Sequence, residues 1–262
     1  MTTAEIGVFG GSGFYDFLED PEELTLDTPY GPPAAPITIG TIGERRVAFL
    51  PRHGRDHEFP PHRVPYRANV WAMRELGVTR LFAPSAAGSL RRNIPPKTFV
   101  VTDQVIDFTK SRANTFYDGP ATTHVSFADP YCPVIREAVV HAALELGIDH
   151  RVGGTMVVIE GPRFSTRAES KMFSQLGGDV IGMTQFPEVT LAREMELCFA
   201  NVALVTDYDV GVDEIEPVSH AEVLKVFGQN IDALRELLFA AIPAVPEERT
   251  CPCASALGGS HG

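Results

Sequence analysis

Short apolar runs alternate with helical segments along almost the whole chain, and this alternation constrains the fold more than any other feature of its 262 residues. Strand-like runs cover residues 5–10, 37–42, 46–51, 80–84, 99–108, 155–159, 179–183 and 200–206. Helical periodicity or helix-start signals cover residues 65–76, 133–146, 167–176, 187–197 and 219–241. The pattern predicts an α/β protein with a largely parallel sheet.

No internal repeat or linker interrupts this pattern, so we expect a single domain over residues 1–242. Residues 243–262, which are rich in Pro, Gly and other small residues, are expected to form a flexible C-terminal tail. Residues 109–132 form a long polar segment. A loop of this length in a compact domain is usually functional, and here it could also reach across an interface.

Acidic residues outnumber basic ones by 34 to 22, which gives a net charge of −12. A surface of this sign repels nucleic acid and anionic lipid, so neither is an expected partner. No apolar run reaches the roughly 18–20 residues of a membrane span, and the N-terminus lacks the basic and apolar regions of a signal peptide. We therefore expect a cytoplasmic protein.

The four cysteines do not suggest a disulfide scaffold. Cys132 and Cys198 lie in apolar stretches and are expected to be small core residues. Cys251 and Cys253 form a C-x-C motif in the tail, where incidental thiols, a local disulfide or an adventitious metal site are the alternatives. A four-ligand zinc site is not expected, because no second Cys/His pair has the spacing of a structural site.

Candidate anion-binding groups follow several of the expected strands, where ligands bind in open α/β sheets. Ser12 lies in a glycine-rich turn whose N–H groups could cradle an anion, although such turns are often purely structural. Arg52 and His53 open a basic segment that suits phosphate, a solvated turn being the alternative. Ser85, in a loop of small residues, and Thr184 each follow a further strand. Together these residues predict a site for one phosphate-sized anion.

Two carboxylates and an aromatic residue could act on a second substrate. Asp207 and Asp209 follow the last expected strand, and burial could raise the pKa of such a carboxyl enough for general-acid catalysis. A loop carboxylate that caps a turn is the alternative. Phe164 could stack on a planar ring or simply belong to the core. These residues suggest a reaction between phosphate and a substrate with a planar leaving group.

Long segments from about residue 6 to residue 241 resemble the trimeric purine nucleoside phosphorylase / methylthioadenosine phosphorylase family. They read IGVFGGSGF, PRHGRDH, FADPYCP, GTMVVIEGPRFSTRAES, MTQFPEVTLARE and LVTDYD. The resemblance implies a purine nucleoside phosphorylase-like fold, in which a twisted mixed sheet is partly closed into a barrel and surrounded by helices. It also implies a homotrimer with no metal and no cofactor, and with inorganic phosphate as co-substrate.

The reaction that the resemblance implies is phosphorolysis of S-methyl-5′-thioadenosine, in which phosphate attacks C1′ while adenine leaves. Its phosphate ligands would be Ser12, Arg52, His53, Ser85 and Thr184. Its other site residues would be Asp207 as the acid at purine N7, Asp209 at the N7/N6 edge, Phe164 at the purine, Met183 at the ribose, His57 and Val223 at the 5′ substituent, and His124 from a neighbouring subunit.

Other activities remain open at this point. Family members that act on 6-oxopurines carry Asn where this chain has Asp207, so Asp207 and Asp209 favour adenine over inosine, guanosine or methylthioinosine. Gly182 and the Gln185–Phe186 pair depart from the family pattern, which leaves other 5′-deoxy-5′-substituted adenosines possible. A hydrolytic nucleosidase and a nucleoside-binding protein without catalysis are the remaining alternatives.

Overall fold

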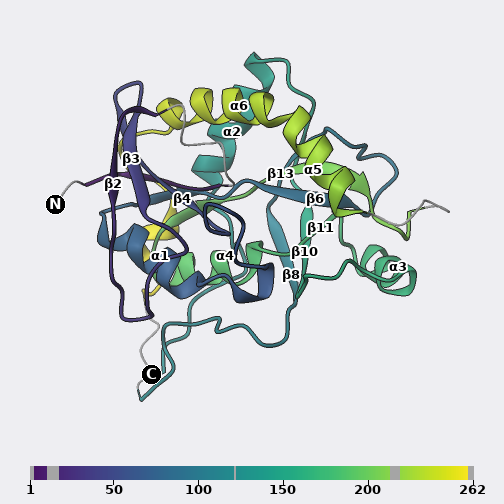
Figure 1. Ribbon diagram of the computed structural model, residues 1–262, viewed down its shortest axis with the longest axis horizontal. Helices are drawn as coiled ribbons and strands as arrows, with labels where there is room; N and C mark the ends of the chain where they lie inside the picture. Colours follow the sequence, from purple (N-terminus) through teal and green to yellow (C-terminus); the bar gives the residue numbers. More distant parts are fainter. Residues whose placement is uncertain (1–2, 11–17, 121, 213–218, 259–262) are drawn as a thin grey trace.

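The computed structural model describes residues 3–10, 18–120, 122–212 and 219–258. Two mixed β-sheets surrounded by helices make up these residues, and one sheet is strongly curled into a half-barrel (Figure 1). The expected architecture, a mixed sheet partly closed into a barrel, is therefore confirmed. Among the described helices, none combines the length and hydropathy of a membrane span.

The first sheet has six strands and contains the N-terminal strand near its centre. In spatial order these are β12 (Cys198–Ala200), β5 (Arg80–Phe82), β1 (Ile6–Gly10), β4 (Arg45–Pro51), β3 (Ile37–Ile42) and β2 (Glu19–Leu24). The first four run parallel, and β3 and β2 are added antiparallel at one edge. All five residues of β1 are buried, which explains why its sequence is apolar without alternation.

The second sheet has seven strands and carries most of the candidate site. In spatial order these are β8 (Gln104–Phe108), β10 (Thr155–Ile159), β11 (Val180–Gly182), β6 (Ser85–Ser89), β13 (Val202–Tyr208), β7 (Phe99–Val101) and β9 (His150–Val152). Direction reverses between β11 and β6 and again between β13 and β7. The sheet is therefore mixed, but four of its six strand pairs are parallel, as are three of the five pairs of the first sheet. The expectation of a largely parallel sheet thus holds for most strand pairs, although neither sheet is wholly parallel.

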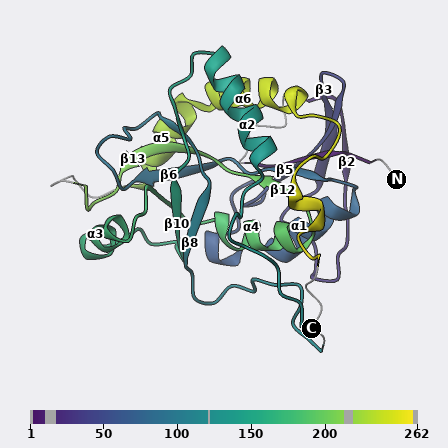
Figure 2. The same ribbon diagram turned by 180° about the vertical axis from the view of Figure 1, so that it is seen from behind.

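Two helix pairs cover the first sheet from opposite sides (Figures 1 and 2). α1 (Tyr66–Glu75) packs against α4 (Gln185–Glu194), and α2 (Pro133–Glu145) packs against α6 (Ile231–Ala244). α3 (Arg167–Gln175) lies apart from both pairs, and α5 (His220–Gln229) packs on β13. Alternate side chains of β1 serve the two layers, because Ile6 and Val8 pack toward α2 and α6 while Phe9 packs on the opposite side.

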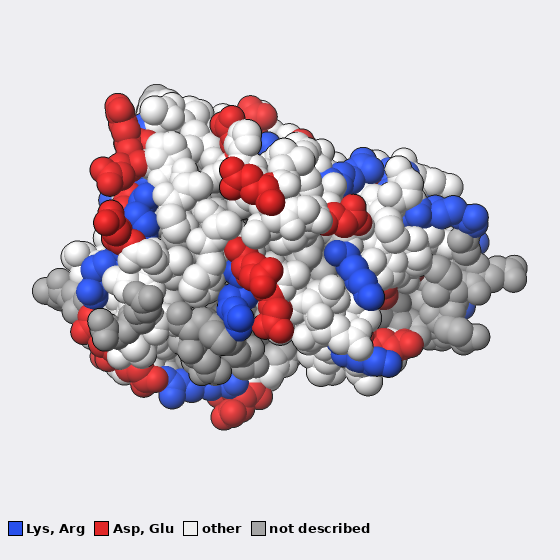
Figure 3. Space-filling view, turned by 90° about the horizontal axis from the view of Figure 1, so that it is seen from above, with Lys and Arg blue, Asp and Glu red and all other residues white. Residues whose placement is uncertain are grey.

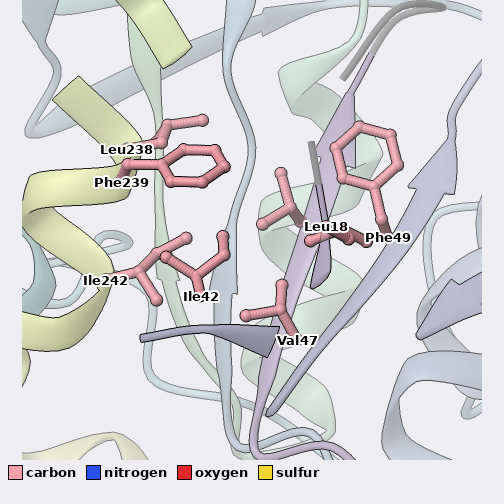
Figure 4. A pocket seen from close by; sticks show the side chains of 8 residues that line it. Leu18, Ile42, Val47, Phe49, Leu238, Phe239 and Ile242 are labelled. Carbon is pink, nitrogen blue, oxygen red and sulfur yellow. The ribbon is translucent and has the colours of Figure 1, made fainter. Parts of the chain in front are cut away.

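A small apolar gap of about 10 Å³ remains between the first sheet and α6. Figure 4 shows Leu238, Phe239 and Ile242 of α6 facing Ile42 and Val47 across it. All of its lining side chains are hydrophobic, and its volume would hold at most about one water molecule. This gap is therefore a packing defect of the core and not a ligand site.

Three expected elements differ from the structure. The small-residue segment from Ser85 to Ser89 is not a loop but the strand β6, which pairs with both β11 and β13. Its side chains are small because neighbours lie close: a Cβ on Gly88 would lie 3.1 Å from Asp207 Oδ2. Residues 99–108 form two strands instead of one, and the helix expected over residues 219–241 is divided at Asn230.

The expected flexible tail also differs from the structure over its described part, residues 243–258. α6 continues to Ala244, and Cys253 and Ala256 are buried. Arg45 Nη1 donates to the Val245 carbonyl at 2.7 Å, and Arg80 Nη2 donates to the Pro246 carbonyl at 2.6 Å. These contacts with the partly buried Arg45 and the buried Arg80 hold the segment against the first sheet.

Charged side chains are interspersed on the face shown in Figure 3, with blue and red groups side by side. Exposed ion pairs such as Arg46–Glu22, at 2.6 Å, join side chains of β4 and β2 across the intervening strand β3. Pairs of this kind contribute little to stability because water screens both charges. One ion pair, Arg52–Glu188, is instead deeply buried, and it belongs to the candidate site.

Candidate active site

A cavity of about 780 Å³ lies between β6, β11, β13, the loop after β10, and α5. This volume is within the range of small-molecule sites. Figure 1 shows these elements converging on one half of the molecule. The lining of the cavity includes ten of the expected site residues: Arg52, His53, His57, Ser85, Phe164, Met183, Thr184, Asp207, Asp209 and Val223.

Two expected site residues are not among them. Ser12 lies outside the described residues. His124 lies on the long segment after β8, is exposed, and does not line the cavity of its own chain.

Arg52 is held rigidly at one part of the cavity wall. Its Nε and Nη2 donate to the two carboxylate oxygens of Glu188 at 2.5 and 3.0 Å, and its Nη1 donates to the Pro84 carbonyl at 3.0 Å. Both side chains of the ion pair are almost completely buried. Bidentate pairing fixes the plane of the guanidinium, and two of its five N–H groups remain for an anion.

Ser85 and Thr184 place hydroxyl groups on the same cavity. Asn201 Nδ2 donates to Ser85 Oγ at 3.0 Å, so the hydroxyl proton of Ser85 is left free to donate to a ligand. Asn201 is itself held by Thr102, whose hydroxyl donates to Asn201 Oδ1 at 3.1 Å. Thr184 is the residue immediately before α4. These groups, together with Arg52, can bind an oxyanion.

His53 is a neutral member of this set. Burial lowers the pKa of His53 to about 4; a hydrogen bond to the Phe59 carbonyl opposes this, and the nearby Arg52 charge adds to it. Nδ1 lies 2.8 Å from that carbonyl, which can only accept, so Nδ1 carries the proton. Nε2 is therefore a lone-pair acceptor, suited to a phosphate oxygen that still carries a proton.

Asp207 has the properties of a general acid. Burial raises its pKa to about 6; the hydrogen bond from Thr206 opposes this, and the nearby Asp209 carboxylate adds to it. The Thr206 hydroxyl donates to Asp207 Oδ1 at 2.7 Å, which orients the carboxyl group. A bulge in β13 between Val205 and Asp207 shifts its register against β6 at this point.

Asp209 is buried beside Asp207 and is held by a different residue. Ser165 Oγ lies 2.7 and 2.6 Å from its two carboxylate oxygens and supplies one proton to the pair. Ser165 follows Phe164, so one loop contributes both the aromatic wall and the group that orients Asp209. The remaining lone pairs of Asp209 can accept hydrogen bonds from an amino group.

The part of the cavity formed by α5 and the start of α6 is mainly apolar. Val223, Leu224, Phe227 and Ile231 line it. Three histidines lie nearby: His53 stacks on His57 with ring centroids 4.4 Å apart, and His57 lies 6.2 Å from His220. This region suits an apolar substituent.

The long segment after β8 is anchored beneath the cavity by Arg112. The side chain is 1 % exposed. Its guanidinium donates to the carbonyls of Met183 at 2.7 Å and Glu160 at 2.6 Å, and also to those of Ile159 and Phe186. Arg112 therefore joins the ends of β10 and β11, which carry Phe164 and Met183 on the loops that follow them.

Sequence reasoning missed the residues that hold the site residues in place: Glu188, Asn201, Ser165 and Arg112. Glu188 is four residues after Thr184, but Thr184 precedes α4 and Phe186 between them has an extended backbone, so helical spacing was no signal for it. Ser165 is adjacent to Phe164 in the sequence. Asn201 and Arg112 had no comparable local signal, because their partners are distant in the sequence.

Comparison with known proteins agrees with this geometry. The family model of the phosphorylase superfamily matches residues 5–243. S-methyl-5′-thioadenosine phosphorylase from Thermofilum pendens is 54% identical, and the match covers 98% of each chain. A purine nucleoside phosphorylase from Streptomyces coelicolor is 53% identical, with 98% of this chain and 95% of the relative covered.

Solved structures of methylthioadenosine phosphorylases are similar to this chain over almost its whole length. A methylthioadenosine phosphorylase from an antarctic soil metagenomic library has a TM-score of 0.94 at 38% identity, and the match covers 100% of this chain and 93% of the other. Methylthioadenosine phosphorylase from Schistosoma mansoni in complex with adenine has a TM-score of 0.91 at 35% identity, with 99% of each chain covered. The chain therefore belongs to the phosphorylase superfamily, among relatives named as nucleoside phosphorylases.

Proposed function

We propose that this protein catalyses the phosphorolysis of S-methyl-5′-thioadenosine to adenine and 5-methylthioribose 1-phosphate, in methionine and purine salvage. One observation carries the proposal: a single cavity holds both the Arg52 anion site and Asp207, a carboxyl group whose pKa is raised to about 6. A phosphorolytic enzyme needs these two elements together.

In the proposed mechanism Arg52, Ser85 and Thr184 bind inorganic phosphate, His53 accepts a hydrogen bond from its protonated oxygen, and Ser12 completes the site. A phosphate oxygen forms a bond to C1′ while the bond from C1′ to N9 breaks and its electron pair moves into the purine. The sugar passes through an oxocarbenium-like state, as in glycoside hydrolysis, and the negative charge of phosphate stabilises it.

Protonated Asp207 gives its proton to N7, so the purine leaves as neutral adenine, and the carboxylate then regains a proton from water. A positioned acid of this kind contributes about 10²–10⁴ to the rate. Asp209, held by Ser165, accepts from the N6 amino group. A 6-oxopurine would place an oxygen against these carboxylates, which disfavours inosine and guanosine.

The apolar end of the cavity supports the methylthio group as the 5′ substituent. Val223, with its neighbours on α5, surrounds that position, and His57 lies at its edge. A 5′ hydroxyl there would lose water without gaining full hydrogen bonding, whereas a thioether needs none. Phe164 is assigned to the purine face and Met183 to the ribose.

The proposal extends to a cytoplasmic homotrimer whose reaction needs no cofactor, with inorganic phosphate as the co-substrate. The exposed position of His124, away from its own chain's cavity, suits a residue that reaches the cavity of a neighbouring subunit. Sedimentation of the full chain tests the trimer.

The decisive experiment compares adenine release from S-methyl-5′-thioadenosine with and without inorganic phosphate. We expect release to require phosphate and to yield the sugar 1-phosphate. Equal release in phosphate-free buffer would mean a hydrolase. Faster turnover of inosine or methylthioinosine would assign the cavity to 6-oxopurines, and tight binding without turnover would leave a binding protein.

A further inference from the structure

Four cysteines from three distant parts of the chain meet at one place in the core. Cys132 is the residue immediately before α2, and Cys198 is the first residue of β12. Cys251 and Cys253 come from the C-terminal segment, where the 3₁₀ helix Pro252–Ser255 packs on the first sheet. All four Sγ atoms lie within 4.8 Å of one another, and Cys198 Sγ lies 3.3 Å from Cys251 Sγ.

We propose that these four thiols, Cys132, Cys198, Cys251 and Cys253, form a structural zinc site. Zn²⁺ prefers four sulfur or nitrogen ligands in a tetrahedron, with Zn–S bonds of about 2.3 Å that place the sulfurs about 3.8 Å apart. The observed separations bracket that value, so small side-chain rotations close the site. Four sulfur donors without oxygen donors select zinc over calcium or magnesium.

The charge around the cluster suits a metal–thiolate centre. Zn²⁺ with four thiolates has a net charge of −2, which is costly to bury without cations nearby. Arg193 Nη1 donates to Cys253 Sγ at 3.6 Å, and its Nε donates to the Ser126 carbonyl at 3.1 Å. The Arg249 guanidinium also lies near enough to act electrostatically on Cys198. Such outer groups orient and tune metal ligands.

The site would connect the C-terminal segment to the core. Cys132 is already joined to the sheet, because its N–H donates to the Phe199 carbonyl at 2.8 Å. Figure 2 shows the C-terminal segment running beside β5 and β12. Metal binding would add Cys251 and Cys253 to this junction. Each thiol that is neutral beforehand would release its proton to water as its Zn–S bond forms, without any change in oxidation state.

The first test measures zinc in the full chain purified with a reductant and without added chelator. We expect about one zinc per chain by elemental analysis. After zinc removal, added Co²⁺ should give the absorption bands of a tetrahedral cobalt–thiolate centre. A reduced chain that takes up neither metal would overturn the proposal, and so would cysteines paired as disulfides that do not bind zinc after reduction.

Variants provide the second test. Cys251→Ser should weaken zinc affinity by more than about 100-fold, since even outer-shell changes cost about 10–100-fold. It should also lower the Tm and expose residues 245–258 to protease, while S-methyl-5′-thioadenosine turnover at 25 °C is retained. Ala254→Ser, which changes an exposed residue of the same 3₁₀ turn, is the matched control and should keep its zinc. Unchanged zinc affinity in Cys251→Ser would exclude a four-thiol site.

Discussion

Arg52 and Glu188 form a bidentate ion pair whose side chains are 4 % and 1 % exposed. Burial raises the pKa of Glu188, and the Arg52 guanidinium acts in the opposite direction. A buried pair of this kind contributes less to net stability than its geometry suggests, but loss of one partner leaves the other charge uncompensated. Its main effect is to orient Arg52 toward the cavity.

Glu188→Gln should therefore damage both folding and phosphate binding. We expect the free energy of unfolding to fall by about 3 kcal/mol, the lower end of the range for a broken buried pair, because Gln keeps one acceptor. The KM for phosphate should rise about tenfold or more as Arg52 loses its orientation. Thermal unfolding and phosphate titration measure these effects. Glu22→Gln, which breaks an exposed pair with Arg46, is the control and should change neither. An unchanged KM for phosphate in Glu188→Gln would show that Glu188 does not position Arg52.

The raised pKa of Asp207 predicts the pH dependence of the reaction. A general acid must be protonated, so kcat/KM should fall as the pH rises above about 6. Asp207→Asn should lower kcat by about 10²–10⁴ and abolish that part of the profile. The pH profile of both proteins with S-methyl-5′-thioadenosine tests this. Near-parental turnover by Asp207→Asn would exclude Asp207 as the acid. The same fall in kcat/KM with rising pH in this variant would also exclude it.

The same carboxyl group should reduce the stability of the fold. Burial raises its pKa from 3.8 to about 6, so the folded state holds the proton more tightly than the unfolded state. The free energy of unfolding therefore falls as the pH rises from about 4 to above 6. The total loss is about 3 kcal/mol, because each pKa unit corresponds to 1.36 kcal/mol. Asp207→Asn should therefore raise the Tm at pH 8 and change it much less at pH 4. A lower Tm at pH 8 would contradict this argument.

Ser165→Ala should affect recognition of the base more than the chemical step. The substitution removes the hydroxyl that holds the buried Asp209 carboxylate. Loss of a hydrogen bond to a charged group costs about 1.5–3 kcal/mol, so the KM for adenine nucleosides should rise about tenfold or more. The ratio of kcat/KM for adenine nucleosides to kcat/KM for hypoxanthine nucleosides should fall. The value of kcat should change less than KM. Ser255→Ala, an exposed residue remote from the cavity, is the control. Unaltered base preference would show that Ser165 does not position Asp209.

Much of the fold could be predicted where local pattern decides it. The strands β3 and β4 and the helix α2 lie close to their expected positions, because short apolar runs and amphipathic periodicity are local properties. β6 could not be recognised in this way. Its residues are small because Asp207 and Ile181 approach its backbone closely, and small residues have no strand signature of their own.

By itself, the sequence singled out the residues to which we assign the chemistry: a basic segment at Arg52, hydroxyls after two strands, and the paired Asp207 and Asp209. These stand out because they follow apolar runs directly. Only the tertiary structure decided what holds them and what else they meet. Arg52 and Glu188 are 136 residues apart, and the four cysteines come from three distant parts of the chain. Chain folding brings such groups together through the packing of sheets and helices, and no local spacing records that contact.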